Sequence, residues 1–356
     1  MTTAAELDAP RADIRTRFQY YEPKSVEEAV KLLKDGKGKV RIIAGGQDMM
    51  GSLKVRAAKP RYTPDMLLSI HAIPGLDKVE AGADGMRIGS LVTLKELRSN
   101  PIVAEKFPSL AFAAGHAATL QIQNAATLGG NLSQDSWCWY YRQEDWRFPC
   151  LRKGGDVCFV ATGDDRYEAI LDPGPCFCVN ASDTAAVLVS LDAQAVIAGP
   201  NGTRTIPLSD YFVHSNVDPK VTNITDPAYE KATEFFLTQI QIPTPRAGAK
   251  AVYLKQTLRS AWEHSRTGAA VAAVVAVNGG AVAHARIVVG GVSSVPYSVP
   301  AAEQMLVGKP LSAALLDQVA AKMMEKAVPM RENRYKQVVA RTLVKRAVAE
   351  AGGMTL

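Results

Sequence analysis

The chain has 356 residues, 47% of them apolar and 21% charged, which is typical of a soluble globular protein with two or three domains. The net charge of +6 is spread along the chain, which argues against a nucleic-acid-binding surface. The longest apolar run, residues 269–277, is too short to span a bilayer, and the polar N-terminus lacks the apolar core of a secretory signal. We therefore expect a soluble, cytoplasmic protein with no direct membrane insertion.

The first part of the chain is predicted to alternate between short strands and helices after a flexible lead over residues 1–17. Ser25 and Glu28 form a capping-box pattern before an amphipathic stretch that ends at Leu33, and Thr93 and Glu96 form a second one. Helices are expected directly after these two boxes and over 109–118. Strands are expected over 40–44, over 66–70 and in a hairpin at 78–92.

The second part of the chain is irregular from Gln134 to Pro175, which in a compact domain usually has a functional reason. Regular patterns then return, and a linker is expected at 219–227. A helix is expected over 185–191, a hairpin over 195–207, a strand over 235–242, an antiparallel sheet from 249–256, 269–277 and 281–290, and helices over 315–326 and 335–351. Strands and helices in mixed order predict an α+β fold with several subdomains.

All five cysteines lie between Cys138 and Cys178. A cytoplasmic protein rarely carries structural disulfides, so such clustering indicates metal or redox chemistry. The alternative is five small buried apolar residues. The scattered histidines show no metal-ligand spacing and are expected to be structural.

Two glycine pairs are candidate ligand loops: Gly45-Gly46 within 43–48, directly after a predicted strand, and Gly129-Gly130 within 124–131. Glycine lets the backbone approach a ligand and direct successive N–H groups at it, as a bound pyrophosphate requires. Neither segment matches the dinucleotide-binding G-x-G-x-x-G pattern or the P-loop. Taken alone, each pair is more typical of a tight turn.

Six segments in a fixed order nevertheless carry a family resemblance: 18–33, 44–48, 127–132, 181–183, 240–243 with 255–259, and 285–292. With them the chain resembles the FAD-binding subunits of the xanthine dehydrogenase and carbon monoxide dehydrogenase family. The resemblance implies a two-lobed, PCMH-like FAD-binding domain, with lobes at 18–76 and 77–245, followed by an α+β C-terminal domain at 246–356.

The resemblance also implies roles for particular residues. The backbone of 43–48 would hold the FAD pyrophosphate, Thr127, Gly130 and Asn131 the ribityl and phosphate region, and Lys255 would lie near the isoalloxazine ring. Asp183 would bond a flavin hydroxyl or nearby backbone, or alternatively cap the following helix. The full set implied to bind FAD is Ile43, Ala44, Gly45, Gly46, Gln47, Asp48, Asn124, Thr127, Gly129, Gly130, Asn131, Asp183, Leu237 and Lys255.

The cysteine segment, 134–177, interrupts the family pattern between the second glycine loop and Asp183. It resembles the branch that includes 4-hydroxybenzoyl-CoA reductase and certain bacterial aldehyde oxidoreductases, in which an insertion holds a [4Fe–4S] cluster. The resemblance implies four thiolate ligands, from Cys138, Cys150, Cys158 and Cys176. Cys178 remains an alternative to Cys176 as the fourth ligand.

The function implied is that of an electron-transferring oxidoreductase subunit with no catalytic side chains of its own. Its expected partners are a large molybdopterin-binding subunit, a small [2Fe–2S] subunit and an external electron acceptor, and export to the periplasm is expected only together with a partner. The substrate stays open between aldehydes, aromatic acyl-CoA thioesters and N-heterocycles. The alternative is a scaffold or assembly protein of the same fold with zinc at the cysteines.

Overall fold

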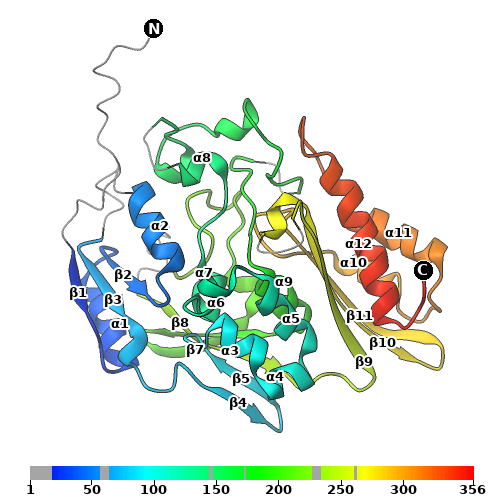
Figure 1. Cartoon of the computed structure of the whole chain (residues 1–356), viewed down its shortest axis with the longest axis horizontal. Helices are drawn as coiled ribbons and strands as arrows, with labels where there is room; N and C mark the ends of the chain where they lie inside the picture. Colours follow the sequence, from blue (N-terminus) through cyan, green and yellow to red (C-terminus); the bar gives the residue numbers. More distant parts are fainter. Residues whose placement is uncertain (1–17, 57–63, 144–146, 172–173, 227–233, 260–262) are drawn as a thin grey trace.

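The computed structural model describes residues 18–56, 64–143, 147–171, 174–226, 234–259 and 263–356, so the predicted lead at 1–17 lies outside the described residues. Three sheets follow one another along the chain, within residues 19–69, 79–243 and 249–298 (Figure 1). The predicted α+β class is confirmed. None of the helices in the described ranges combines the length and the apolar character that a membrane crossing needs.

The first sheet is parallel, in the order β1 (Gln19–Tyr21), β3 (Met66–Ser69), β2 (Val40–Ile43). Helix α1 (Val26–Asp35) packs Ala29 and Leu33 into the core with Leu68. Ser25 caps this helix as predicted, but the Glu28 carboxylate accepts from the Lys24 N–H, so the capping box is only half formed. Helix α2 (Gln47–Arg56), which follows β2 directly, is not predicted from the sequence pattern.

The second sheet is antiparallel and has five strands. Their order is β4 (Val79–Gly82), β5 (Gly85–Gly89), β8 (Phe236–Pro243), β6 (Gln194–Gly199) and β7 (Gly202–Pro207). Both predicted hairpins are present, and β8 joins them. Figure 1 shows the helices gathered beside this sheet: α3 (Leu94–Ser99), α4 (Pro101–Lys106), α5 (Pro108–His116), α6 (Leu120–Gln123), α7 (Leu128–Ser133) and α9 (Asp183–Ser190).

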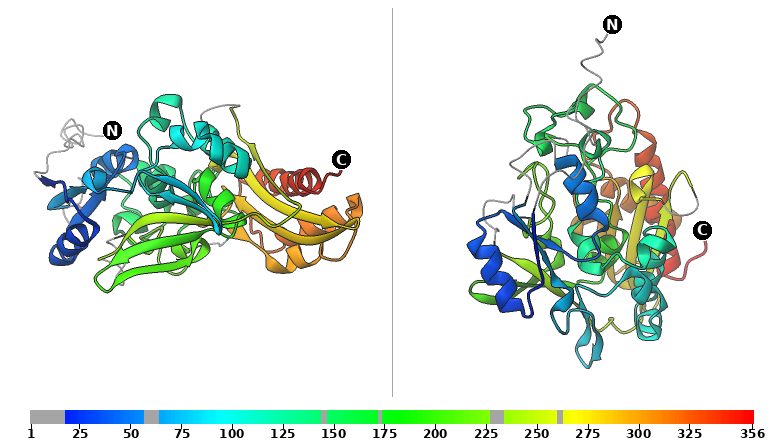
Figure 2. Two further views of the ribbon diagram at one scale, coloured as in Figure 1. Left: turned by 90° about the horizontal axis from the view of Figure 1, so that it is seen from below. Right: turned by 60° about the vertical axis from the view of Figure 1, so that its left-hand side comes forward.

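The third sheet is the predicted antiparallel one, in the order β12 (Tyr297–Ser298), β11 (Ala281–Gly290), β10 (Ala269–Asn278), β9 (Ala249–Gln256). Strand β10 is buried along its first eight residues, because α12 (Tyr335–Ala351) packs against it together with α9. Its near-continuous apolar sequence reflects burial on both faces. Helices α10 (Pro300–Gln304), α11 (Ala313–Met323) and α12 lie at the end of the molecule opposite the first sheet (Figure 2).

The segment that carries the cysteines has little regular structure. It contains α8 (Trp139–Arg142) and short helical turns at Leu151–Lys153 and Phe159–Ala161. In Figure 1 it lies above the helices of the second sheet and next to α2, which α8 contacts. It has its own buried cluster, formed by Cys138, Tyr141, Cys150, Val160, Cys176 and Cys178.

Candidate functional site

A cavity of about 340 Å³ lies where the first sheet, the helices of the second sheet and the cysteine segment meet. Its volume is in the range of cofactor-binding pockets. Both glycine loops contribute to its wall, through residues 44–49 of the first and 126, 127 and 129–131 of the second. The remaining wall comes from segments that are distant in sequence, among them 117–119, 133–135, 225–226 and 235–237.

The first glycine loop connects the end of β2 at Ile43 to the start of α2 at Gln47. Gly46 has a φ of +72°, in the left-handed region that favours glycine. A Cβ atom at Gly45 would lie 1.9 Å from the carbonyl oxygen of Ala125, so the two loops are in direct backbone contact. Only glycine fits at this contact.

The amide N–H groups at this loop are free to bind an anion. Among the described residues, no acceptor pairs with the backbone N–H groups of Gly46, Gln47 or Asp48. The first N–H groups of a helix have no partner within the helix, and together with the helix dipole they favour a negatively charged ligand. The start of α2 therefore offers a preformed phosphate site on the cavity wall.

The second glycine loop is organised differently, because its amides are already used. Thr127 caps α7 and accepts from the Gly130 N–H, while the Leu128 and Gly129 N–H groups donate to the carbonyls of Val92 and Ser90. The side chain of Asn131 accepts from the hydroxyls of Ser182 and Thr184 at 2.6 Å. Its amino group has no acceptor among the described residues, and Asn131 is in the cavity wall. This loop thus contributes close packing and one amide side chain.

Three carboxylates on the cavity wall are each paired with an arginine. The pairs are Asp48 with Arg142 at 2.6 Å, Asp226 with Arg41 at 3.1 Å and Asp135 with Arg152 at 3.9 Å. A diphosphate entering the cavity therefore meets neutralised acids and free amides, which fits an anionic dinucleotide such as FAD.

Comparison with known proteins agrees with this geometry. The family model of the FAD binding domain in molybdopterin dehydrogenase matches residues 16–245. The chain belongs to this family. The model of the CO dehydrogenase flavoprotein C-terminal domain matches residues 252–351 of the same FAD-binding subunit. The family predicted from the sequence is confirmed, and with it an oxidoreductase subunit that binds FAD.

Relatives align with this subunit along nearly its whole length. The glyceraldehyde dehydrogenase medium chain of Sulfolobus acidocaldarius is 26% identical, covering 94% of this chain and 98% of its own. The aldehyde oxidoreductase FAD-binding subunit PaoB of Escherichia coli is 29% identical, covering 87% and 91%. A chain of the solved carbon monoxide dehydrogenase from Hydrogenophaga pseudoflava superposes with a TM-score of 0.71 at 26% identity, covering 95% and 98%.

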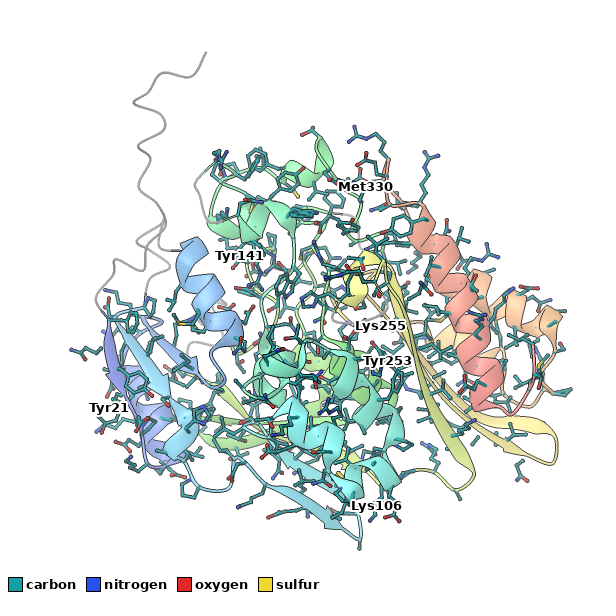
Figure 3. The ribbon with its side chains drawn as sticks, in the orientation of Figure 1. Tyr21, Lys106, Tyr141, Tyr253, Lys255 and Met330 are labelled. Atoms are coloured by element: carbon teal, nitrogen blue, oxygen red, sulfur yellow. The ribbon has the colours of Figure 1, made fainter. Side chains whose placement is uncertain are left out.

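The cavity brings together most of the residues implied to bind FAD. Its wall contains Ala44, Gly45, Gly46, Gln47, Asp48, Thr127, Gly129, Gly130, Asn131 and Leu237, but not Ile43, Asn124, Asp183 or Lys255. Asp183 accepts from the Tyr253 hydroxyl and from the Lys255 ammonium, both at 2.7 Å, and Tyr253 and Lys255 lie next to each other in Figure 3. The alternative role of Asp183 as helix cap is wrong, because Ser182 caps α9.

Sequence reasoning missed an aromatic part of the wall, made by Trp137 and His264. Their rings are in contact in a tilted arrangement, with centroids 4.1 Å apart, and the Arg142 guanidinium lies 4.6 Å from the centre of the Trp137 ring. Burial, with the positive charge of Lys255 next, lowers the pKa of His264 to about 3, so this imidazole is neutral. No sequence spacing links these residues, since the fold alone brings them together.

The four cysteines implied as ligands line one small cavity. Cys138, Cys150, Cys158 and Cys176 are in its wall, while Cys178 is buried outside it. Hydrogen bonds from the Cys158 and Cys178 thiols hold the pKa of the Cys176 thiol well below its usual range.

The donor chemistry of this cavity fits an iron–sulfur cluster, which takes four thiolates. Its geometry is not that of a preformed single-ion site. In the described part of the chain, no three His, Cys, Asp or Glu side chains are close enough together to hold one metal ion. The volume of about 10 Å³ has room for little more than a water molecule, so the thiols would have to move outward around a cluster.

Proposed function

We propose that this chain is the electron-transferring subunit of a multisubunit molybdenum hydroxylase. Electrons would pass between iron–sulfur centres and an external acceptor through its FAD, which can take up electrons singly and deliver them in pairs. The partners proposed are a large molybdopterin-binding subunit and a small [2Fe–2S] subunit. The chain has no C-x4-C-x2-C pattern for a [2Fe–2S] centre, and relatives of matching length are named as medium chains.

The observation that carries this proposal is the 340 Å³ cavity with free helix amides on its wall. The start of α2 would hold the FAD diphosphate, and the amino group of Asn131 would donate to the chain that links diphosphate and flavin. Trp137 and the neutral imidazole of His264 would cover the ligand and exclude water. The substrate reaction belongs to the partner subunit in this proposal.

We further propose a [4Fe–4S] cluster held by Cys138, Cys150, Cys158 and Cys176. Support comes from the gathering of these four thiols around one cavity, although they come from four separate parts of an irregular segment. The alternative of a scaffold protein would place zinc, or no metal, at the same cysteines.

The purified native complex tests these proposals by its absorption spectrum and its flavin, iron and zinc content. Flavin bands with about four irons for this chain, beyond those of the small subunit, are expected. Flavin without the additional iron would reject the cluster but keep the electron-transferring subunit. A colourless chain with one zinc would support the scaffold. Co-purification of a molybdopterin-binding chain and a [2Fe–2S] chain is expected, and their absence would reject the proposed partners.

A further inference from the structure

A buried arginine lies in the wall of the cysteine-lined cavity. Arg152 is in the helical turn Leu151–Lys153, and its side chain is 1% exposed. Its Nη2 group donates to the Cys178 sulfur at 3.2 Å and to the Val221 carbonyl at 3.1 Å. The other residues of this wall are cysteine, aromatic or aliphatic, so Arg152 is the charged group among those described there.

The hydrogen-bond donors of Arg152 are only partly used within the described residues. Its Nε and Nη1 atoms have no hydrogen-bond acceptor there, and the nearest carboxylate oxygen, on Asp135, lies 3.9 Å from Nη1. That carboxylate also accepts from the Tyr141 hydroxyl at 2.6 Å and belongs to the wall of the larger cavity. A guanidinium buried with unused donors is unfavourable unless an anion completes its pairing.

Among the described residues, the other cationic side chains of the cysteine segment do not lie in the wall of the cysteine-lined cavity. The Lys153 ammonium is not in the cavity wall and donates to the carbonyl of Gln143, while Arg142 pairs with Asp48. Arg147 is exposed to solvent. Among these cations of the segment, Arg152 is therefore the one in the wall of the cysteine cavity.

We propose that Arg152 is a fixed positive charge that stabilises an anionic iron–sulfur cluster in this cavity and raises the reduction potential of that cluster. The inference rests on the proposed [4Fe–4S] site. A cluster with four thiolate ligands carries net negative charge, and reduction by one electron adds another. A buried cation beside it stabilises the reduced form more than the oxidised form, because little water screens the interaction. Arginine keeps its charge at all ordinary pH values, so this effect does not depend on titration.

The test is Arg152→Gln in the assembled complex, read by a redox titration of the cluster followed by electron paramagnetic resonance. Iron and flavin content should stay at the wild-type level. The equilibrium should shift about tenfold toward the oxidised cluster, which is a lowering of about 59 mV for a one-electron couple. Arg152→Lys should restore most of the potential, and Arg147→Gln should leave it unchanged.

An unchanged potential in Arg152→Gln with full iron content would overturn the inference. Wild-type protein without this iron would overturn the proposed cluster site instead. If Arg152→Gln does not assemble, because it leaves Asp135 buried without its arginine, the double variant Asp135→Asn/Arg152→Gln is compared with Asp135→Asn alone. The double variant should have the lower potential, and equal potentials would reject a role for the arginine charge.

Discussion

Asp48 at the start of α2 and Arg142 in α8 form an ion pair of 2.6 Å, although 94 residues separate them in the sequence. The second oxygen of the Asp48 carboxylate accepts from the Asp135 N–H at 2.8 Å. The helix that presents free amides to the large cavity is thus tied to the segment that carries the cysteines. The cysteine segment is therefore part of the cavity wall rather than a separate appendage.

Arg142→Met should weaken FAD binding. Its side chain is 15% exposed and that of Asp48 25%, so solvent screens the pair only partly. Losing a charged hydrogen bond in such a place costs about 1.5–3 kcal/mol, which corresponds to tenfold or more in affinity if the start of α2 loses its position. Fluorescence quenching of FAD added to the flavin-free protein measures the dissociation constant.

Arg87→Met is the matched control, because Arg87 and Asp84 also pair at 2.6 Å but are 40% and 72% exposed. Exposed pairs contribute little, so the FAD affinity of this variant should equal that of the wild type. Equal weakening in both variants would mean that the Asp48–Arg142 link has no specific role.

Gly45→Ala should abolish flavin binding and lower the melting temperature. The new Cβ would lie 1.9 Å from the Ala125 carbonyl oxygen, so the two loops would have to separate. Gly51→Ala, inside α2, is the control, because its Cβ would meet only Arg142 Nη1 at an ordinary 3.6 Å. Replacing a glycine within a helix by alanine stabilises by about 0.5–1 kcal/mol, so this variant should retain flavin. Flavin content and thermal unfolding are measured for both variants, and equal flavin content in the two would contradict the prediction.

Local sequence signals predicted much of the fold. The Thr93–Glu96 capping box has both of its hydrogen bonds. The two hairpins turn at the predicted positions, between Gly82 and Gly85 and between Gly199 and Gly202. Helix α2 was missed because its sequence is polar, contains Gly51 and has no apolar stripe. The place of β8 between β5 and β6 was not predictable either, since strand order depends on contacts between distant segments.

The site was predictable where the backbone itself forms it. The two glycine pairs marked the loops, and the family resemblance ordered them. Side-chain pairing across the fold had no local signal, because neither the Trp137–His264 ring contact nor the Asp183–Lys255 ion pair follows from spacing in the sequence. The two cavities likewise require the folded chain, because their walls collect residues from many separate segments.

Lys255→Met should destabilise the protein by about 3–5 kcal/mol, because it leaves the fully buried Asp183 carboxylate without its cation. The double variant Lys255→Met/Asp183→Asn should recover most of this loss. Since neither residue is in the cavity wall, the folded double variant should bind FAD normally. Urea unfolding and flavin titration measure the two effects. Normal stability with lost flavin in the single variant would instead support a direct role of Lys255 at the isoalloxazine ring.

Lys336→Met should remove a pH dependence of stability between about pH 7 and pH 10. The buried ammonium donates to the carbonyls of Tyr167, Glu168 and Gly291, and burial lowers the pKa of Lys336 from 10.5 to about 7. The pKa of Lys336 is lower in the folded protein than in the unfolded chain, so folding favours the neutral amine. The contribution of this amine to the free energy of unfolding therefore has its full value above pH 10.5 and is lost as the pH falls through 7.

Urea unfolding of wild type and Lys336→Met at several pH values tests this prediction. The free energy of unfolding of the wild type, minus that of Lys336→Met, should increase from pH 7 to pH 10. Burial raises the pKa of Glu168 from 4.5 to about 7, so the stability linked to its protonation is lost between those values, below this window. A constant difference from pH 7 to pH 10 would show that Lys336 keeps its charge when the protein folds.

Cys150→Ser and Cys178→Ser should separate a cluster ligand from a buried bystander. Both thiols are buried in the same segment, 7% and 1% exposed, but only Cys150 is in the wall of the small cavity. Cys150→Ser should therefore lose the iron–sulfur signal while the flavin, in its own cavity, stays bound. Cys178→Ser should keep the iron, because its sulfur accepts from Arg152 instead of facing the cavity. Iron loss in Cys178→Ser, with iron retained in Cys176→Ser, would show that Cys178 is the fourth ligand.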